Sequence, residues 1–181
     1  MNPGKHDAVI TNGSTERFIE KILTLITFRA ANPREADTLT KIAIASKRHW
    51  GYSDDMINLW APELTFTRKS IESNFVTVAV SDGTLIGVSA LELDSTRAEL
   101  VGLWVLPSWI GNGVGRRLLN RVLKTAAEKG YDAITVVSDP NAAAFYMRMG
   151  GYRVGSVEST PPGRMLPQFE ISTTPQKHRK H

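Results

Sequence analysis

A glycine-rich segment over residues 110–116 places the tightest constraint on how this chain can fold. It separates an apolar run over 100–106 from a stretch over 114–126 in which apolar residues recur at helical spacing. A second apolar run, over 133–137, follows that helix. This order predicts a strand–helix–strand crossover between parallel strands, because parallel neighbours cannot be joined by a tight hairpin.

The other apolar runs predict antiparallel pairs around this crossover. Ser81-Asp82-Gly83-Thr84 has the composition of a hairpin turn. Asn32-Pro33-Arg34-Glu35 predicts a helix start, since Asn can cap and Glu35 can reach back to the cap amide. The fold class is therefore α/β, with a mixed, mostly antiparallel sheet of six to seven strands flanked by about four helices. Strands are expected over 27–31, 75–80, 85–93, 100–106, 133–137, 152–157 and 166–171, and helices over 33–49, from 53 onward, over 114–126 and over 141–149.

Two of these elements carry specific burial predictions. In the helix after Asn32, the apolar spacing predicts one buried face, formed by Ala36, Leu39, Ile42, Ala43 and Ser46. Residues 133–137 are nearly all apolar, which predicts a strand buried on both faces.

Composition limits the kinds of protein that this chain can be. Its 181 residues, 41% hydrophobic and 22% charged, fit one globular domain. The absence of cysteine excludes disulfides, a thiol nucleophile and zinc–thiolate sites, and it suits the cytoplasm. No apolar run reaches the roughly 20 residues that span a bilayer, and residues 1–14 lack the apolar core of a secretory signal. We expect a cytoplasmic protein with no membrane partner.

The formal net charge of +4 comes mostly from the end of the chain. Lys177, Arg179 and Lys180 supply three of these four charges from the last five residues. A short basic tail is more typical of a solubilising end than of a nucleic-acid docking arm. We therefore expect no nucleic-acid partner, and a nucleic-acid-binding tail remains only an alternative.

The glycine segment has the composition of a phosphate-binding loop. Glycines let successive backbone N–H groups converge on an anion, and the following helix adds its N-terminal donors. A P-loop would need Gly-Lys-Ser/Thr where Gly115-Arg116-Arg117 stands, and Gly111-x-Gly113-x-Gly115 does not fit the G-x-G-x-x-G of a dinucleotide-binding loop. A plain glycine turn before a helix is the alternative interpretation.

The motifs together resemble the GNAT N-acetyltransferase superfamily, in particular its small bacterial members. Gly113-Val114-Gly115 between a strand and a helix is similar to that family's acyl-CoA loop. Residues 141–146, Asn-Ala-Ala-Ala-Phe-Tyr, followed by Gly150, are similar to its N-x-x-A-x-x-Y helix and closing glycine. Residues 162–167, Pro-Gly-Arg-Met-Leu-Pro, are similar to a C-terminal signature, and the resemblance covers about residues 26–172.

This resemblance implies a domain organisation and an activity. Residues 26–172 would form the GNAT domain, between a partly flexible N-terminal extension (1–25) and a basic C-terminal tail (173–181). The family transfers an acetyl group from acetyl-CoA, without a metal, by direct attack of an amine on the thioester. We expect the acceptor to be a primary amine of a small molecule or peptide. A non-catalytic acyl-CoA-binding regulatory module is the alternative, and a homodimer through the last strands is compatible with the resemblance.

The resemblance also assigns cofactor contacts. The family breaks strand pairing with a bulge near Leu103, Trp104 and Val105, whose backbone would bind the thioester and pantetheine. Trp104 would wall the acyl pocket or be a core aromatic. Ile110 departs from the Gln or Arg usual at the first loop position, which removes one side-chain contact. The remaining contacts would come from Gly111, Asn112, Gly113, Val114, Gly115 and Arg116 in the loop, and from Asn141, which holds pantetheine or caps its helix.

Two residues match the family's catalytic positions. Glu99, eleven residues before Ile110, resembles the general base that deprotonates the amine in the histone-acetylating branch. An exposed glutamate at a strand edge is the alternative. Tyr146 matches the residue that donates to the leaving thiolate, and the alternative is a tyrosine packed beside Phe145.

Acceptor specificity is expected from the first two helices and their joining loop. His49, Trp50 and Tyr52, with Trp60 and nearby acids, suit a cationic amine. The same aromatics could instead anchor the two helices in the core. No second histidine stands at ligand spacing from His49, so we expect no metal site. Arg164 would contact the cofactor or an adjoining subunit.

Overall fold

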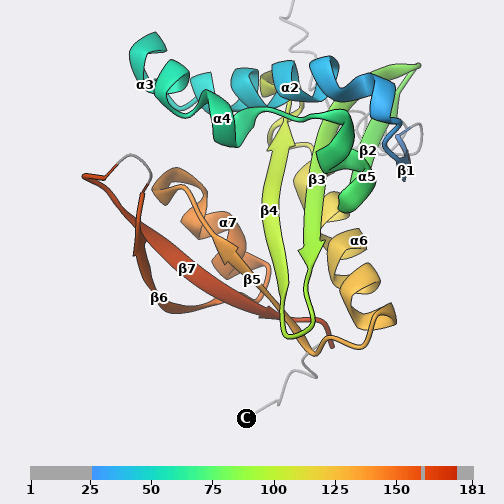
Figure 1. The fold of residues 1–181 in the computed structure, drawn as a ribbon, viewed down its shortest axis with the longest axis vertical. Helices are drawn as coiled ribbons and strands as arrows, with labels where there is room; N and C mark the ends of the chain where they lie inside the picture. The colour runs from blue at the N-terminus through green and yellow to red at the C-terminus, as the bar shows by residue number, and fades with distance from the viewer. Residues whose placement is uncertain (1–25, 160–161, 175–181) are drawn as a thin grey trace, which may run out of the picture.

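The computed structural model describes residues 26–159 and 162–174. A seven-stranded sheet with the order β1-β2-β3-β4-β5-β7-β6 runs through this part of the chain (Figure 1). β4 and β5 are parallel, and every other neighbouring pair is antiparallel. The α/β fold class and the strand–helix–strand crossover are therefore confirmed. The strands are β1 (Thr27–Ala30), β2 (Phe75–Ser81), β3 (Thr84–Leu93), β4 (Ala98–Val105), β5 (Ala133–Val137), β6 (Tyr152–Glu158) and β7 (Met165–Ser172).

The described residues form six α-helices rather than about four. The extra helices arise after Ser53, which caps the first of three short helices. Pro62 lies in the first turn of the second, and Thr67 caps the third through Ser70 N–H. Proline and a new capping residue each end a preceding helix, so one expected helix is divided. The helices are α2 (Ala36–Arg48), α3 (Asp54–Leu59), α4 (Ala61–Leu64), α5 (Arg68–Ser73), α6 (Val114–Glu128) and α7 (Ala143–Arg148).

Short 3-10 turns precede three of these elements. They are η1 (Pro33–Glu35) before α2, η2 (Pro107–Trp109) before the glycine loop and η3 (Pro140–Ala142) before α7. The predicted helix start at η1 is confirmed: Asn32 accepts from Arg34 N–H at 2.9 Å, and Glu35 accepts from Asn32 N–H at 2.7 Å.

The predicted hairpin turn between β2 and β3 is also confirmed. Ser81 pairs with Thr84, and the two residues between them have positive φ, 47° at Asp82 and 76° at Gly83. Both central residues of a type I′ turn need this conformation, which matches the twist of the flanking strands.

Helices cover the two faces of the sheet unequally. α2 to α5 pack on one face of β2 and β3, and α6 packs on the other. α7 shares a core cluster with α6, β5 and β7 (Figure 1). The predicted buried face of α2 is confirmed at all of its positions, Ala36, Leu39, Ile42, Ala43 and Ser46.

The prediction that β5 is buried on both faces is wrong. Ile134 and Val136 are buried, but Val137 is 36% exposed. The reason is the shape of the sheet: β4 pairs with β5 at Glu99 and Thr135 alone among the described residues, and Figure 1 shows the two strands diverging from that end. One face of β5 therefore borders an open space instead of a covering helix.

Two further expectations concern residues beyond this part of the chain. The N-terminal extension over 1–25 and residues 175–181 of the basic tail lie outside the described residues. Within the described ranges, none of the helices has the length and apolar character needed to cross a bilayer.

Candidate active site

β4 presents a free edge where it separates from β5. The register of β4 with β3 shifts between Ala90 and Leu91, so Val101 is the extra residue of a β-bulge. The bulge expected near 103–105 therefore lies nearer the start of the strand. Beyond it the ladder with β3 is regular, as Leu106 N–H donates to Ile86 O at 2.9 Å.

This regular ladder fixes the direction of the backbone donors. Because N–H groups alternate between the two edges of a strand, Leu106 and Trp104 donate toward β3, and Leu103 and Val105 point toward the side of β5. β5 makes no pair with either of them in the described structure. The N–H groups of Leu103 and Val105 can thus bind a ligand, whereas Trp104, whose N–H and C=O both face β3, can contribute only its side chain.

The glycine segment forms a left-handed turn into α6. Gly111 and Gly113 have φ of 86° and 77°, and Gly113 is the N-cap residue. The first N–H groups of a 15-residue helix then lack intrahelical partners and attract an anion. Gly115 lies close to the strand edge, since a Cβ there would stand 3.6 Å from both Leu103 and Phe145. Arg116 is exposed beside the turn, and Ile110 packs against apolar residues.

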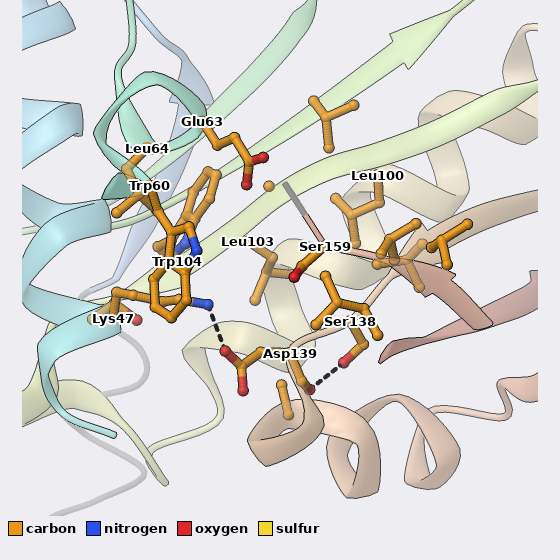
Figure 2. Close-up of a pocket in the computed structure, with 18 of the residues that line it drawn as sticks. Lys47, Trp60, Glu63, Leu64, Leu100, Leu103, Trp104, Ser138, Asp139 and Ser159 are labelled. Carbon is orange, nitrogen blue, oxygen red and sulfur yellow. Dashed lines mark hydrogen bonds and ion pairs between the residues drawn. The ribbon is translucent and has the colours of Figure 1, made fainter. Parts of the chain in front are cut away.

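A cavity of about 550 Å³ opens between β4 and β5. Figure 2 shows Trp60 and Glu63 entering it from the helices, Leu103 and Trp104 from β4, and Ser138, Asp139 and Ser159 from the far side. Of the residues singled out in the sequence, the cavity brings together Trp50, Trp60, Glu99, Leu103, Trp104, Tyr146 and Arg164. His49, Tyr52, Val105, Asn141 and the glycine loop do not line it.

Tyr146 reaches this cavity from the core. Its ring is buried and contacts Phe145 and Phe169, with centroids 5.1 and 6.2 Å away. Its hydroxyl has no hydrogen-bond partner among the described residues, although the side chain lines the cavity. Burial raises the pKa of this phenol well above its usual range, so the group stays neutral and can donate a hydrogen bond.

Glu99 lies near the start of β4, on the sheet face that also carries Trp104. It pairs across the ladder with Glu92, and its nearest cation is Arg97 Nη1 at 3.9 Å. Its side chain is partly exposed and lines the cavity. A carboxylate here can accept a proton from a group bound in the cavity.

Sequence reasoning missed a polar cluster at one wall of the cavity. Asp139 accepts from Lys47 Nζ at 2.5 Å and from the Tyr52 hydroxyl at 3.0 Å, and Arg164 Nη2 lies 3.7 Å away. Asp139 is also the N-cap residue of η3, where its side chain accepts from Asn141 N–H. Burial raises the pKa of Asp139, but these hydrogen bonds outweigh burial and lower the pKa overall. The Asp-Pro-Asn sequence at 139–141 could have indicated that Asp139 caps a helix. No local sequence pattern indicates that Lys47, Tyr52 and Arg164 contact it.

The predicted acceptor residues separate into two groups. Tyr52 belongs to the polar cluster: its hydroxyl accepts from Arg164 Nη2 at 3.0 Å and from Asn141 Nδ2 at 3.1 Å. Trp50 lines the cavity, while His49 ends α2 on the surface, edge-on to Trp50. Asn141 thus joins this cluster from η3, and its side chain makes no cap for α7, whose N-cap residue is Ala142.

The donor set fits a thioester of coenzyme A. The left-handed glycine turn suits a phosphate group, and the two backbone donors at the unpaired strand edge suit amide and carbonyl oxygens. The Tyr146 hydroxyl, which lines the cavity without a partner in the described structure, suits the sulfur. In the described ranges, no three His, Cys, Asp or Glu side chains cluster as metal ligands would.

Comparison with solved structures places this fold among N-acetyltransferases. A GCN5-related N-acetyltransferase from Rhodopseudomonas palustris aligns with a TM-score of 0.68 and 21% identity, over 81% of this chain and 94% of that one. The PaiA N-acetyltransferase from Thermoplasma acidophilum, solved with coenzyme A, aligns with a TM-score of 0.65 and 22% identity, over 81% and 98%. An aminoglycoside 6'-N-acetyltransferase, also complexed with coenzyme A, aligns with a TM-score of 0.63 and 18% identity, over 83% of this chain and 98% of that one.

The sequence itself identifies the family. The model of the acetyltransferase (GNAT) family matches residues 39–151, more than half of the chain. The protein therefore belongs to the GNAT acetyltransferase family, as its motifs predicted. Among curated proteins, none matches the chain significantly.

Proposed function

We propose that this protein is an acetyl-CoA-dependent N-acetyltransferase that acetylates a primary amine of a small molecule or peptide. The observation that carries the proposal is the meeting of Glu99, Tyr146 and the free edge of β4 in one cavity. Acetyl-CoA supplies the acetyl group as a thioester, whose C–S bond breaks as the new C–N bond forms. The glycine loop would hold its pyrophosphate, and Leu103 and Val105 N–H would donate to its carbonyl and pantetheine oxygens.

Glu99 is the proposed general base. An alkylamine with a pKa of about 10.4 is protonated at neutral pH, and removing that proton costs roughly 4 kcal/mol. Glu99 accepts the proton directly or through water. Asp139 is a poorer candidate because Lys47 and Tyr52 already bind its oxygens and its pKa is lowered.

Tyr146 is proposed to stabilise the leaving thiolate. Its hydroxyl lacks another partner in the described structure and lines the cavity. Since burial raises its pKa above that of a thiol, about 8.5, full proton transfer to sulfur is uphill. A donated hydrogen bond, followed by protonation from solvent, is the role that this pKa supports.

Thiol release from acetyl-CoA in the presence of a panel of amines, amino acids and peptides tests this proposal. Glu99→Gln and Tyr146→Phe should each lower kcat on the best acceptor by about 10²-fold, with acetyl-CoA affinity retained. Glu92→Gln and Tyr152→Phe are the matched controls, since neither residue lines the cavity. Both should keep wild-type rates.

A non-catalytic acyl-CoA-binding module gives a different result. It would bind acetyl-CoA without releasing thiol in the presence of any acceptor. Calorimetric binding of acetyl-CoA, measured beside turnover, separates the two functions.

The proposal extends to assembly and location. A homodimer through the last strands is supported by β6, which is an edge strand with exposed Tyr152 and Val154. Light scattering of the purified protein tests it. The cysteine-free sequence suits a cytoplasmic enzyme.

A further inference from the structure

We propose that Arg164 and Lys47 form a subsite for a carboxylate of the acceptor, so that the preferred acceptor carries both an amine and a carboxylate. This inference rests on the proposed function and specifies its substrate class. It starts from the polar cluster around Asp139, which joins α2, the loop after β5 and the β6–β7 connection.

The cluster holds more positive than negative charge. Lys47 and Arg164 line the cavity with side chains 18% and 25% exposed, and they share one carboxylate, Asp139. Hydrogen bonds keep Asp139 ionised, so the three groups sum to one positive charge. No other carboxylate lies within ion-pair distance of Lys47 or Arg164 among the described residues. A partly buried excess charge favours a counter-ion from a ligand.

Arg164 is oriented and still has free donors. Its guanidinium carbon lies 5.0 Å from the Tyr52 ring centroid and 4.7 Å from that of Trp60, and Nη2 donates to the Tyr52 hydroxyl at 3.0 Å. In the described structure, its Nε and Nη1 groups make no hydrogen bond. A guanidinium held against two rings loses little freedom on binding, and its planar fork matches a carboxylate.

Lys47 is fixed in the same way. Its Nζ lies 5.1 Å from the Tyr52 centroid and 4.7 Å from the Trp60 centroid, while it donates to Asp139. The two cations therefore occupy the faces of both aromatic rings. An acceptor ammonium would meet positive charge there, which argues that the amine end lies elsewhere.

The acidic part of the cavity lining is the better place for the acceptor's amine. Glu63, Glu99 and Glu158 line the same cavity, and Glu99 is the proposed base. Cations at one wall and carboxylates at another give the cavity a polarity. An acceptor with both charges can place its carboxylate at the cationic wall and its amine at the acidic wall, whereas a simple alkylamine complements only the acidic wall.

Paired acceptors that differ only in a carboxylate test this proposal. The probes are 4-aminobutyrate with propylamine and L-lysine with cadaverine. We expect the carboxylated member of each pair to have at least about a 10-fold higher kcat/KM, which corresponds to one charge-assisted contact. Equal values, or a preference for the decarboxylated amines, would overturn the proposal.

Variants assign the effect to the subsite. Arg164→Gln should raise KM for the carboxylated acceptor about 10-fold while leaving the KM of its decarboxylated partner and the Kd of acetyl-CoA within about 2-fold. Arg164→Lys, which keeps the charge without the fork, should give an intermediate KM. Arg153→Gln is the matched control, because Arg153 lies on β6 outside the cavity. If Arg164→Gln instead weakens acetyl-CoA binding, the Arg164 guanidinium contacts the cofactor and the proposal is rejected.

Failure of the proposed function gives a separate signal. If no acceptor is acetylated, calorimetric titration of the protein–CoA complex with 4-aminobutyrate tests whether the carboxylate subsite exists. Binding that Arg164→Gln abolishes, and Arg153→Gln leaves intact, would support the subsite without the transferase activity. Absent binding, or equal binding by both variants, would overturn the subsite. Thermal unfolding of each variant verifies that it is folded.

Discussion

The indole ring of Trp104 lies over Gly102, two positions earlier on β4. A Cβ atom on Gly102 would stand 1.8 Å from Trp104 Cζ3 and 2.1 Å from Cη2, far inside van der Waals contact. The same ring meets Phe66 edge-on, with centroids 5.7 Å apart. Because Trp104 lines the cavity, the missing side chain at Gly102 fixes one of the cavity walls.

Adding a methyl group at Gly102 should therefore displace Trp104. We expect Gly102→Ala to lower the free energy of unfolding by about 1–3 kcal/mol through overpacking, measured by urea denaturation. Gly155→Ala is the matched control, because the nearest atom to its Cβ would be Gln168 Oε1 at an ordinary 3.7 Å. The added cost of Gly102→Ala should shrink in a Trp104→Ala background. An unchanged cost there would contradict the account of this contact.

Gly113 is predicted to matter for acetyl-CoA binding more than for folding. Its φ of 77° is strained for any other residue, and it caps the end of α6 that would hold the pyrophosphate. Gly113→Ala should lower stability by about 1 kcal/mol and weaken acetyl-CoA binding at least about 10-fold by calorimetry.

Gly130 provides the control for this prediction. It has a similar φ of 88° and follows the opposite end of α6, with no atom within 4 Å of a built Cβ. Gly130→Ala should show the same loss of stability with unchanged acetyl-CoA affinity. Equal weakening of acetyl-CoA binding by both variants would mean that the loop has no special role.

The ion pairs of Asp139 predict a pH dependence of stability. Since the folded pKa of Asp139 lies below its ordinary value, its contribution is present above pH about 4 and disappears as the pH falls through the folded pKa. Asp139→Asn should cost about 2 kcal/mol at pH 7, and the difference from wild type should narrow below pH about 4. Urea denaturation across pH measures it. Glu128→Gln, in the exposed pair with Lys124, should cost under about 0.5 kcal/mol at every pH.

Two buried serines should respond in opposite ways to truncation. Ser89 is on β3, which pairs with β2 and β4, and its buried Oγ has no hydrogen-bond partner in the described structure. Ser138 is equally inaccessible, but its Oγ donates to Asp139 O at 2.7 Å. Ser89→Ala should be neutral or stabilising by up to about 1 kcal/mol, and Ser138→Ala destabilising by about 1 kcal/mol. Thermal and urea denaturation compare them, and a larger loss from Ser89→Ala would contradict the assignment.

Local chemistry made much of the fold predictable from sequence. The cap at Asn32, the turn at Asp82 and Gly83, and the buried stripe of α2 depend on residues within a few positions of one another. Each of these predictions agrees with the structure. The crossover between antiparallel pairs was also predictable, because parallel neighbours need a long connection whereas a tight turn joins antiparallel ones.

Long-range contacts account for what the sequence left unpredicted. The Lys47–Asp139 pair joins residues 92 positions apart, and Arg164 meets Tyr52 across 112 positions. The bulge at Val101 depends on how β3 pairs with β4, and the exposure of Val137 depends on β4 and β5 separating. No local pattern encodes such features, since each arises only when distant elements pack together.

Stoichiometric product analysis tests the central claim most directly. Purified protein is incubated with acetyl-CoA and an amine panel, and free thiol and N-acetylated amine are quantified from the same samples, with a Glu99→Gln sample beside them. The account predicts equal amounts of thiol and N-acetylated amine for at least one acceptor, and roughly 10²-fold less of both with Glu99→Gln. Tight acetyl-CoA binding with no N-acetylated product from any amine, or equal rates for Glu99→Gln and wild type, would contradict it.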